Sequence, residues 1–151
     1  MEIECKFLVN ESLWKSVKPA TGKEIKQGYF TSNEQFSVRV RTKGSKGFLT
    51  IKGAREGIAR DEFEYEIPYE DALFMLNTYC QPYLEKTRYE VNFQGMTWEI
   101  DEFHGKLEGL ILAEIELETI HQSFEKPDWV TEDVSTNSTY FNSEIIKRLH
   151  H

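Results

Sequence analysis

The feature that most constrains the fold is an alternation of charged and apolar residues that recurs in short segments along the chain. In the first segment, residues 1–9, the charged members are Glu2, Glu4 and Lys6. Successive side chains of a β-strand point to opposite faces, so such a segment carries its charges on one face only. We predict eight strands of this kind, at 1–9, 25–31, 35–43, 48–52, 60–67, 83–93, 96–102 and 110–118.

The connections between the predicted strands are mostly short, which favours antiparallel hairpins over parallel crossovers. Amphipathic patterns predict helices at 10–18 and 69–80, and short helices around Pro127 within 121–149. Eight antiparallel strands close readily into a barrel, which removes exposed sheet edges. We therefore expect an α+β, mainly β, chain that forms one domain over 1–151 with an eight-stranded antiparallel closed barrel.

Charged residues occupy one face of nearly every predicted strand, and few neutral polar residues separate them. One interpretation is an ordinary sandwich with its charges in solvent. We favour the inverse, in which the charges line the lumen and the helices at 10–18 and 69–80 cover the apolar outer face. The charged face consists of Glu2, Glu4, Lys6, Arg39, Arg41, Lys52, Glu62, Glu64, Lys86, Arg88, Glu99, Asp101, Glu114 and Glu116.

A charged lumen loses solvation energy unless its charges are paired or bind ions. Arginine and lysine side chains match phosphate oxygens, and clustered carboxylates match Mg²⁺ or Mn²⁺. A phosphate chain bridged to divalent metal would satisfy both sets, so the pattern predicts a polyphosphate ligand together with metal.

Composition limits the other functions. The 151 residues carry a net charge of −8, which argues against nonspecific binding of nucleic acid or of anionic membranes. The two cysteines, Cys5 and Cys80, lie far apart, as expected of reduced thiols in a cytoplasmic protein. No apolar run is long enough to span a membrane, and the first residues do not resemble a signal peptide. His104 and His121 fall in predicted loops without metal-type spacing, and His150 and His151 are given no role.

The segment Glu2-Ile3-Glu4-Cys5-Lys6 resembles the ExExK motif of the CYTH family, also called the triphosphate tunnel metalloenzymes. The resemblance extends through further segments in the same order and spacing, which together cover nearly the whole chain. These are 27–29, 38–41, 49–53, 60–65, 84–89, 98–103 and 113–117. The family fold is an eight-stranded antiparallel tunnel with a charged lumen, and its members bind a triphosphate group with divalent metal.

The resemblance implies roles for the charged residues, with two sites for Mg²⁺ or Mn²⁺. The implied metal ligands are Glu2, Glu4, Glu62, Glu64, Asp101, Glu114 and Glu116. The implied phosphate-binding set is Lys6, Arg39, Arg41, Lys52, Arg60, Lys86 and Arg88. Glu4, Lys6 and Lys86 are the implied catalytic residues.

Small bacterial members that resemble this chain are mostly inorganic triphosphatases, so the leading hypothesis is metal-dependent hydrolysis of inorganic triphosphate to diphosphate and phosphate. One metal would offset the charge of the phosphate oxygens, and a second would acidify the attacking water. The alternatives are an adenylate cyclase and a non-catalytic module that binds polyphosphate or nucleotide. The sequence leaves the general base, the preferred metal and the oligomeric state open, with a homodimer among the options.

The C-terminal region departs from the family pattern. Members often have a motif close to Gly-x-Glu-Val-Thr-x-Asp-x-x-Tyr-x-Asn, and this chain matches it at Val134, Tyr140 and Asn142 but differs at four other positions within 131–142. The helix expected at 142–149 is a candidate plug for one mouth of the tunnel.

Overall fold

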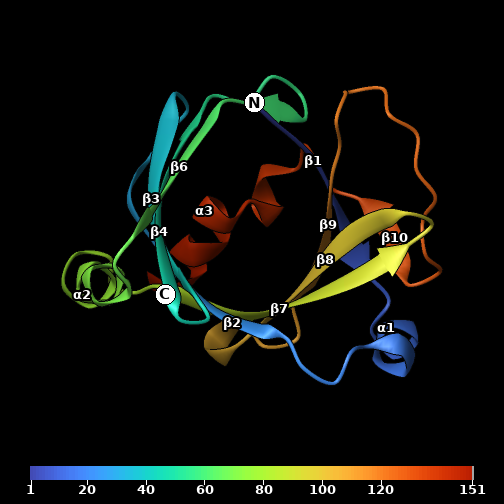
Figure 1. Cartoon of the computed structure of the whole chain (residues 1–151), viewed down its shortest axis with the longest axis horizontal. Helices are drawn as coiled ribbons and strands as arrows, with labels where there is room; N and C mark the ends of the chain where they lie inside the picture. The colour runs from blue at the N-terminus through green and yellow to red at the C-terminus, as the bar shows by residue number, and fades with distance from the viewer. Residues whose placement is uncertain (151) are drawn as a thin grey trace.

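The computed structural model describes residues 1–150 and consists of one antiparallel sheet with a few short helices (Figure 1). All eight predicted strands are present. The predicted strand 60–67 is divided into two strands, and a further strand forms at 130–133. The strands are β1 (Glu2–Val9), β2 (Lys23–Ser32), β3 (Phe36–Lys43), β4 (Lys46–Gly53), β5 (Ala59–Arg60), β6 (Glu62–Ile67), β7 (Leu84–Phe93), β8 (Met96–Phe103), β9 (Ile111–Glu116) and β10 (Val130–Asp133).

The sheet curls round until its ends meet at β1. Its strand order is β10-β1-β9-β8-β7-β2-β3-β4-β6, and β5 pairs with β1. Only Asp61 separates β5 from β6, so the predicted strand 60–67 divides its pairing between β1 and β4. In Figure 1 the strands surround a central space, and we call this space the tunnel. The prediction of a mainly β barrel is confirmed, with a short ladder at its seam.

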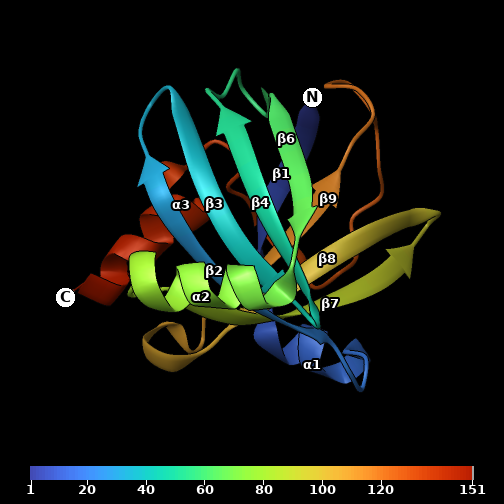
Figure 2. The same cartoon turned by 60° about the vertical axis from the view of Figure 1, so that its left-hand side comes forward.

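Two helices lie outside the sheet, as predicted. They are α1 (Glu11–Val17) and α2 (Tyr69–Tyr79), whereas the C-terminal region contains α3 (Asn142–Ile145). Short 3₁₀ turns cover Gly105–Leu107, Ser138–Tyr140 and Ile146–His150. Helix α2 crosses β3 and β4 (Figure 2). It approaches so closely that a Cβ at Gly47 would lie 2.7 Å from that of Ala72, so this position needs a glycine.

The main hydrophobic core lies between the outer face of the sheet and the segments that cover it. Phe7, Trp98 and Ile115 project from β1, β8 and β9 into this core, and Trp14 of α1 and Trp129 join them. The two covering tryptophans contact each other with ring centroids 5.1 Å apart. Burial of such large rings contributes to the apolar stabilisation on this side of the sheet. Among residues 1–150, no helix is long and apolar enough to cross a membrane.

The prediction that helices cover the apolar outer face of the sheet is wrong for part of that face. Phe63 and Tyr65 of β6 remain 55% and 57% exposed, because α2 packs against other positions of β3 and β4. Phe74 and Tyr79 of α2 are also exposed, since the helix buries Ala72 and Leu76 instead. The segment 130–133, expected near helices, is the strand β10 and pairs with β1.

Candidate active site in the tunnel

The tunnel contains a polar cavity of about 210 Å³. Every member of the predicted charged face except Asp101 lines it, so the inverse interpretation is confirmed and the ordinary sandwich is excluded. The cavity also receives residues that the sequence did not single out as lumen residues. These are Tyr29, Ser37, Lys43, Arg55, Phe141, Asn142 and Ser143.

Strand register places opposite charges side by side across the inner face. Lys6 of β1 pairs in register with Glu114 of β9, and Lys52 of β4 pairs with Glu62 of β6. The Lys52 Nζ atom lies 3.0 Å from a Glu2 oxygen and 3.1 Å from a Glu62 oxygen. Burial alone would raise the pKa of Glu2, but the Lys52 ammonium group lowers that pKa to about 2.

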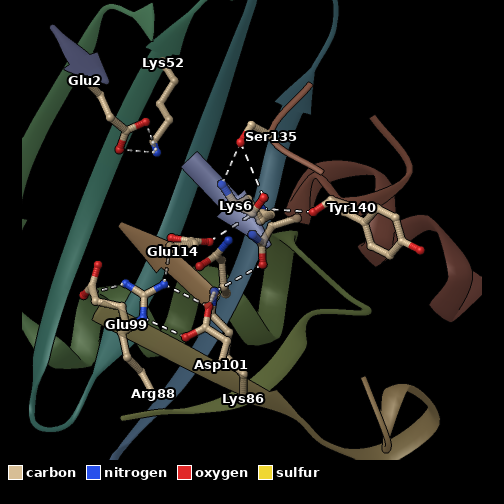
Figure 3. A network of polar contacts seen from close by, with 12 residues as sticks. Glu2, Lys6, Lys52, Lys86, Arg88, Glu99, Asp101, Glu114, Ser135 and Tyr140 are labelled. Carbon is tan, nitrogen blue, oxygen red and sulfur yellow. Dashed lines mark hydrogen bonds and ion pairs between the residues drawn. The ribbon is translucent and has the colours of Figure 1, made fainter. Parts of the chain in front are cut away.

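The deepest ion pairs join β7 to β8 (Figure 3). The Arg88 guanidinium group donates two hydrogen bonds to the two oxygens of Asp101, at 2.7 and 2.9 Å. Lys86 Nζ lies 2.8 Å from Asp101 Oδ2. Burial lowers the pKa of Lys86 to about 8 although Asp101 opposes this shift. Both oxygens of Asp101 are therefore already engaged, with the side chain only 1% exposed.

The C-terminal segment contacts the same lysines. Lys6 Nζ donates to the Tyr140 carbonyl oxygen at 3.0 Å, and Lys86 Nζ donates to Asn142 Oδ1 at 3.1 Å. The Lys6 backbone N–H donates to Ser135 Oγ at 2.9 Å (Figure 3). Residues 135–142 are thereby fixed against the first strand and the tunnel, and a neutral oxygen acceptor lies beside each of these two ammonium groups.

The remaining predicted cations also have polar partners. Arg39 and Arg41 lie 3.4 and 3.8 Å from Glu64 Oε2, and Arg60 lies 3.4 Å from Glu2 Oε1. Burial and the adjacent Arg39 lower the pKa of Arg41 to about 10. All seven residues of the predicted phosphate-binding set thus line one cavity.

Three carboxyl groups of the tunnel have a raised pKa. Burial, together with the adjacent carboxylates of Glu114 and Glu2, raises the pKa of Glu4 to about 8. Burial also raises the pKa of Glu62 and of Glu116. Glu4 and Glu116 lie directly opposite each other on β1 and β9, where like charges repel. This part of the tunnel would gain stability from an added cation.

The donor set fits a hard divalent cation. Carboxylate oxygens are the preferred ligands of Mg²⁺ and Mn²⁺, and Mg²⁺ usually retains several waters beside one or two carboxylates. Within residues 1–150, no three acidic, histidine or cysteine side chains form a ready-made metal cage. Glu4 nevertheless lies opposite Glu116 in the sheet and close enough to Glu114 and Glu2 for their charges to raise its pKa, and a bound cation would relieve this repulsion.

The raised pKa of Glu4 leads to a prediction for the metal-free protein. Between pH 4.5 and about 8 the folded state holds a proton on Glu4 that the unfolded state has lost. The stability gained from this proton is complete below pH 4.5 and is lost as the pH rises through about 8. Glu4→Gln removes this titration, so the variant should gain stability relative to the wild type as the pH rises.

The measurement is urea unfolding with a chelator at several pH values. The difference in unfolding free energy between Glu4→Gln and the wild type should grow by more than about 1.4 kcal/mol, the equivalent of one pKa unit. Taking the difference cancels the titration of the other carboxyl groups. A difference that does not change with pH would contradict the raised pKa.

Two cations of the cavity were missed: Arg55, whose position lacks strand alternation, and Lys43, which continues the alternation of Arg39 and Arg41 at the end of the predicted strand 35–43. Arg55 belongs to the loop between β4 and β5, and Lys43 is the last residue of β3. For Lys43 this alternation was the available signal, whereas for Arg55 the only signal was a basic residue in the loop that follows a predicted strand. Asn142 was recognised as part of a C-terminal motif, but its contact with Lys86 depends on long-range packing.

The fold and the cavity together define a class: antiparallel tunnel proteins with charged side chains inside and apolar side chains outside. A family model described as the CYTH domain matches residues 1–148, and the chain belongs to this family. A curated protein of Acetivibrio thermocellus named inorganic triphosphatase is 46% identical over 147 residues, which is 97% of this chain and 93% of that protein. A second protein with the same name, from Nitrosomonas europaea, is 31% identical over 80% of this chain and 82% of its own length.

Solved structures agree with this assignment. A crystal structure described as that of an inorganic triphosphatase matches with a TM-score of 0.66 and 28% identity, covering 97% of this chain and 94% of that chain. A Bacillus halodurans structure, provisionally described as an adenylate cyclase, also has a TM-score of 0.66 and covers 80% of this chain and 82% of that chain. Its identity is 15%, so it supports the fold alone.

Proposed function

We propose that this chain catalyses the divalent-metal-dependent hydrolysis of inorganic triphosphate to diphosphate and phosphate. The observation that carries the proposal is the composition of the cavity, where nine lysine and arginine side chains converge with seven glutamates. Cations alone would suffice to bind phosphate, whereas the opposed carboxyl groups call for metal as well. The two curated relatives named inorganic triphosphatase support the same activity.

The charged residues of the cavity divide into two groups by the ligand that each would bind. Lys6, Lys52, Lys86 and the arginines would bind phosphate oxygens and stabilise the charge of the transferred phosphoryl group. Two Mg²⁺ or Mn²⁺ ions, when bound, would offset phosphate charge and acidify a water molecule. The residues that would hold them are Glu2, Glu4, Glu62, Glu64, Glu114 and Glu116.

Asp101 is the predicted metal ligand whose surroundings suit another role best. Its two oxygens accept hydrogen bonds or ion pairs from Arg88 and Lys86, and the side chain does not line the cavity. We propose that Asp101 positions these two cations. Coordination of a metal would require Asp101 to release at least one of them.

The C-terminal residues support the proposed plug at one mouth of the tunnel. Phe141, Asn142 and Ser143 line the cavity, and α3 follows directly. In Figure 1 α3 appears within the ring, and in Figure 2 it lies to one side of the strands, as expected of a helix behind the ring in the first view. We propose that 142–149 covers this mouth and belongs to a single domain with the barrel.

A cytoplasmic location is proposed from the free cysteines Cys5 and Cys80.

The test is phosphate release from inorganic triphosphate, ATP and thiamine triphosphate, each with Mg²⁺ or Mn²⁺. The protein should carry no added N-terminal tag, because Glu2 lies beside the first residue and lines the cavity. We expect release from inorganic triphosphate to exceed release from either of the other two, and to stop when the metal is chelated.

The same assay discriminates the alternatives. Formation of cyclic AMP and diphosphate from ATP would indicate a cyclase. A rise in melting temperature with triphosphate, but no phosphate release from any substrate, would indicate a binding module. Either outcome would overturn the proposed hydrolysis.

A further inference from the structure

Arg55 differs from the other arginines and from most of the lysines of the cavity because it has no anionic partner. Among the described residues, neither a hydrogen bond nor an ion pair engages its guanidinium group, and its one close contact is an aromatic ring. Arg60, five residues further on at the end of β5, lies 3.4 Å from Glu2. Arg60 therefore has a carboxylate in ion-pair contact, whereas Arg55 is attracted by the carboxylates of Glu4, Glu2 and Glu114 without an ion pair to any of them.

The aromatic contact fixes the orientation of this unpaired cation. Arg55 Cζ lies 3.8 Å from the centroid of the Phe141 ring, which is close enough for stacking of the guanidinium plane on the ring. Stacking uses the face of the guanidinium group and leaves the N–H donors at its edge free. These donors form the planar fork that matches two phosphate oxygens.

Phe141 is itself held in place from both sides. Its neighbours Tyr140 and Asn142 accept hydrogen bonds from Lys6 and Lys86. Arg55, Lys6 and Lys86 therefore meet the same three residues of the C-terminal segment, at one end of the cavity. Half-burial and repulsion from Arg60 lower the pKa of Arg55 although the carboxylates of Glu4, Glu2 and Glu114 oppose this shift, so a further anion in direct contact with Arg55 would be stabilised.

We propose that Arg55 is a further substrate-binding residue, which binds a phosphate group of the triphosphate while Phe141 fixes the plane of its guanidinium group. The proposal rests on the proposed function only for the identity of the anion. Phe141 is a positioning residue in this arrangement, because it contacts Arg55 and not the phosphate.

The experiment measures affinity without turnover. Tripolyphosphate is titrated into the protein by calorimetry in the presence of a chelator, and KM is then measured with Mg²⁺. Arg55→Gln should weaken binding and raise KM about 10- to 100-fold, the usual effect of losing hydrogen bonds to a charged group. Arg55→Lys should fall between this variant and the wild type, because it keeps the charge but not the fork.

Phe141 and a matched surface charge complete the design. Phe141→Leu should weaken binding about 2- to 5-fold. Phe141→Tyr keeps an aromatic ring and should bind as the wild type does. Lys46→Gln, which removes one positive charge from an exposed position outside the cavity, should bind as the wild type does. Thermal unfolding of each free variant verifies that it is folded.

An affinity and a KM within twofold of the wild type in Arg55→Gln would overturn the role of Arg55. Wild-type affinity in Phe141→Leu would overturn the role of the ring. Failure of the proposed function gives a different result. In that case the wild type binds tripolyphosphate without releasing phosphate, and the calorimetric comparison still decides the role of Arg55.

Discussion

Glu4→Gln is expected to abolish metal-dependent turnover while leaving the protein folded. Glu4 lies opposite Glu116 and close enough to Glu2 and Glu114 for their charges to raise its pKa. Glutamine has nearly the same shape but cannot supply a carboxylate oxygen to a cation. We expect a loss of at least about 10³-fold in kcat with Mg²⁺ or Mn²⁺, because a metal contributes several kcal/mol to the stabilisation of the transition state.

A matched control is Glu66→Gln on β6. Its carboxylate lies 3.9 Å from Lys46 Nζ and is 60% exposed, and it does not line the cavity. This variant should retain wild-type turnover. Circular dichroism and thermal unfolding would establish that both variants are folded. Wild-type activity in Glu4→Gln would count against metal binding at this position.

Asp101→Asn is expected to have the largest effect on stability. The substitution preserves volume but removes the negative charge between Arg88 and Lys86, which lie 2.7 and 2.8 Å from its oxygens. Breaking a buried ion pair leaves an uncompensated buried charge, which typically costs about 3–5 kcal/mol. Burial would raise the pKa of Asp101, but Arg88 and Lys86 lower it, so the native interaction favours the ionised form.

The measurement is chemical unfolding at neutral pH, with Glu66→Gln again as the control. That control should remain within about 0.5 kcal/mol of the wild type, because exposed ion pairs contribute little. A similar small change in Asp101→Asn would show that water enters and solvates Arg88 and Lys86. It would also remove the basis for Asp101 as a positioning residue.

The sequence predicted the barrel because the alternation of charged and apolar residues within each strand determines which side chains share a face of the sheet. Glu2, Glu4 and Lys6 had to share a face, and the same held for Arg39 and Arg41, so the charged lumen followed once the strands were recognised. The family resemblance added the order of the strands and the triphosphatase activity. The CYTH match and the relatives named inorganic triphosphatase agree with both.

The features that were missed depend on partners distant in sequence. β10 has only four residues, too few for periodicity to register, and it forms because β1 offers an unpaired edge. Arg55 enters the cavity from a loop and stacks on a ring 86 positions away. Exposure of Phe63 and Tyr65 was unforeseen because the sequence shows that α2 is amphipathic but not which strands it covers.

The position of β1 at the seam determines when this protein can complete its fold. Its three partners along the sheet are β5, β9 and β10, and none of them begins before residue 59. During translation at about 5–20 residues per second, the first strand therefore waits roughly 5–20 s for β9 to emerge. Until then β1 has no partner strand other than the two residues of β5, and the nascent chain exposes its apolar residues. The ring of strands therefore closes late in biosynthesis, because the strand order, more than the stability of any strand, determines when β1 meets its partners.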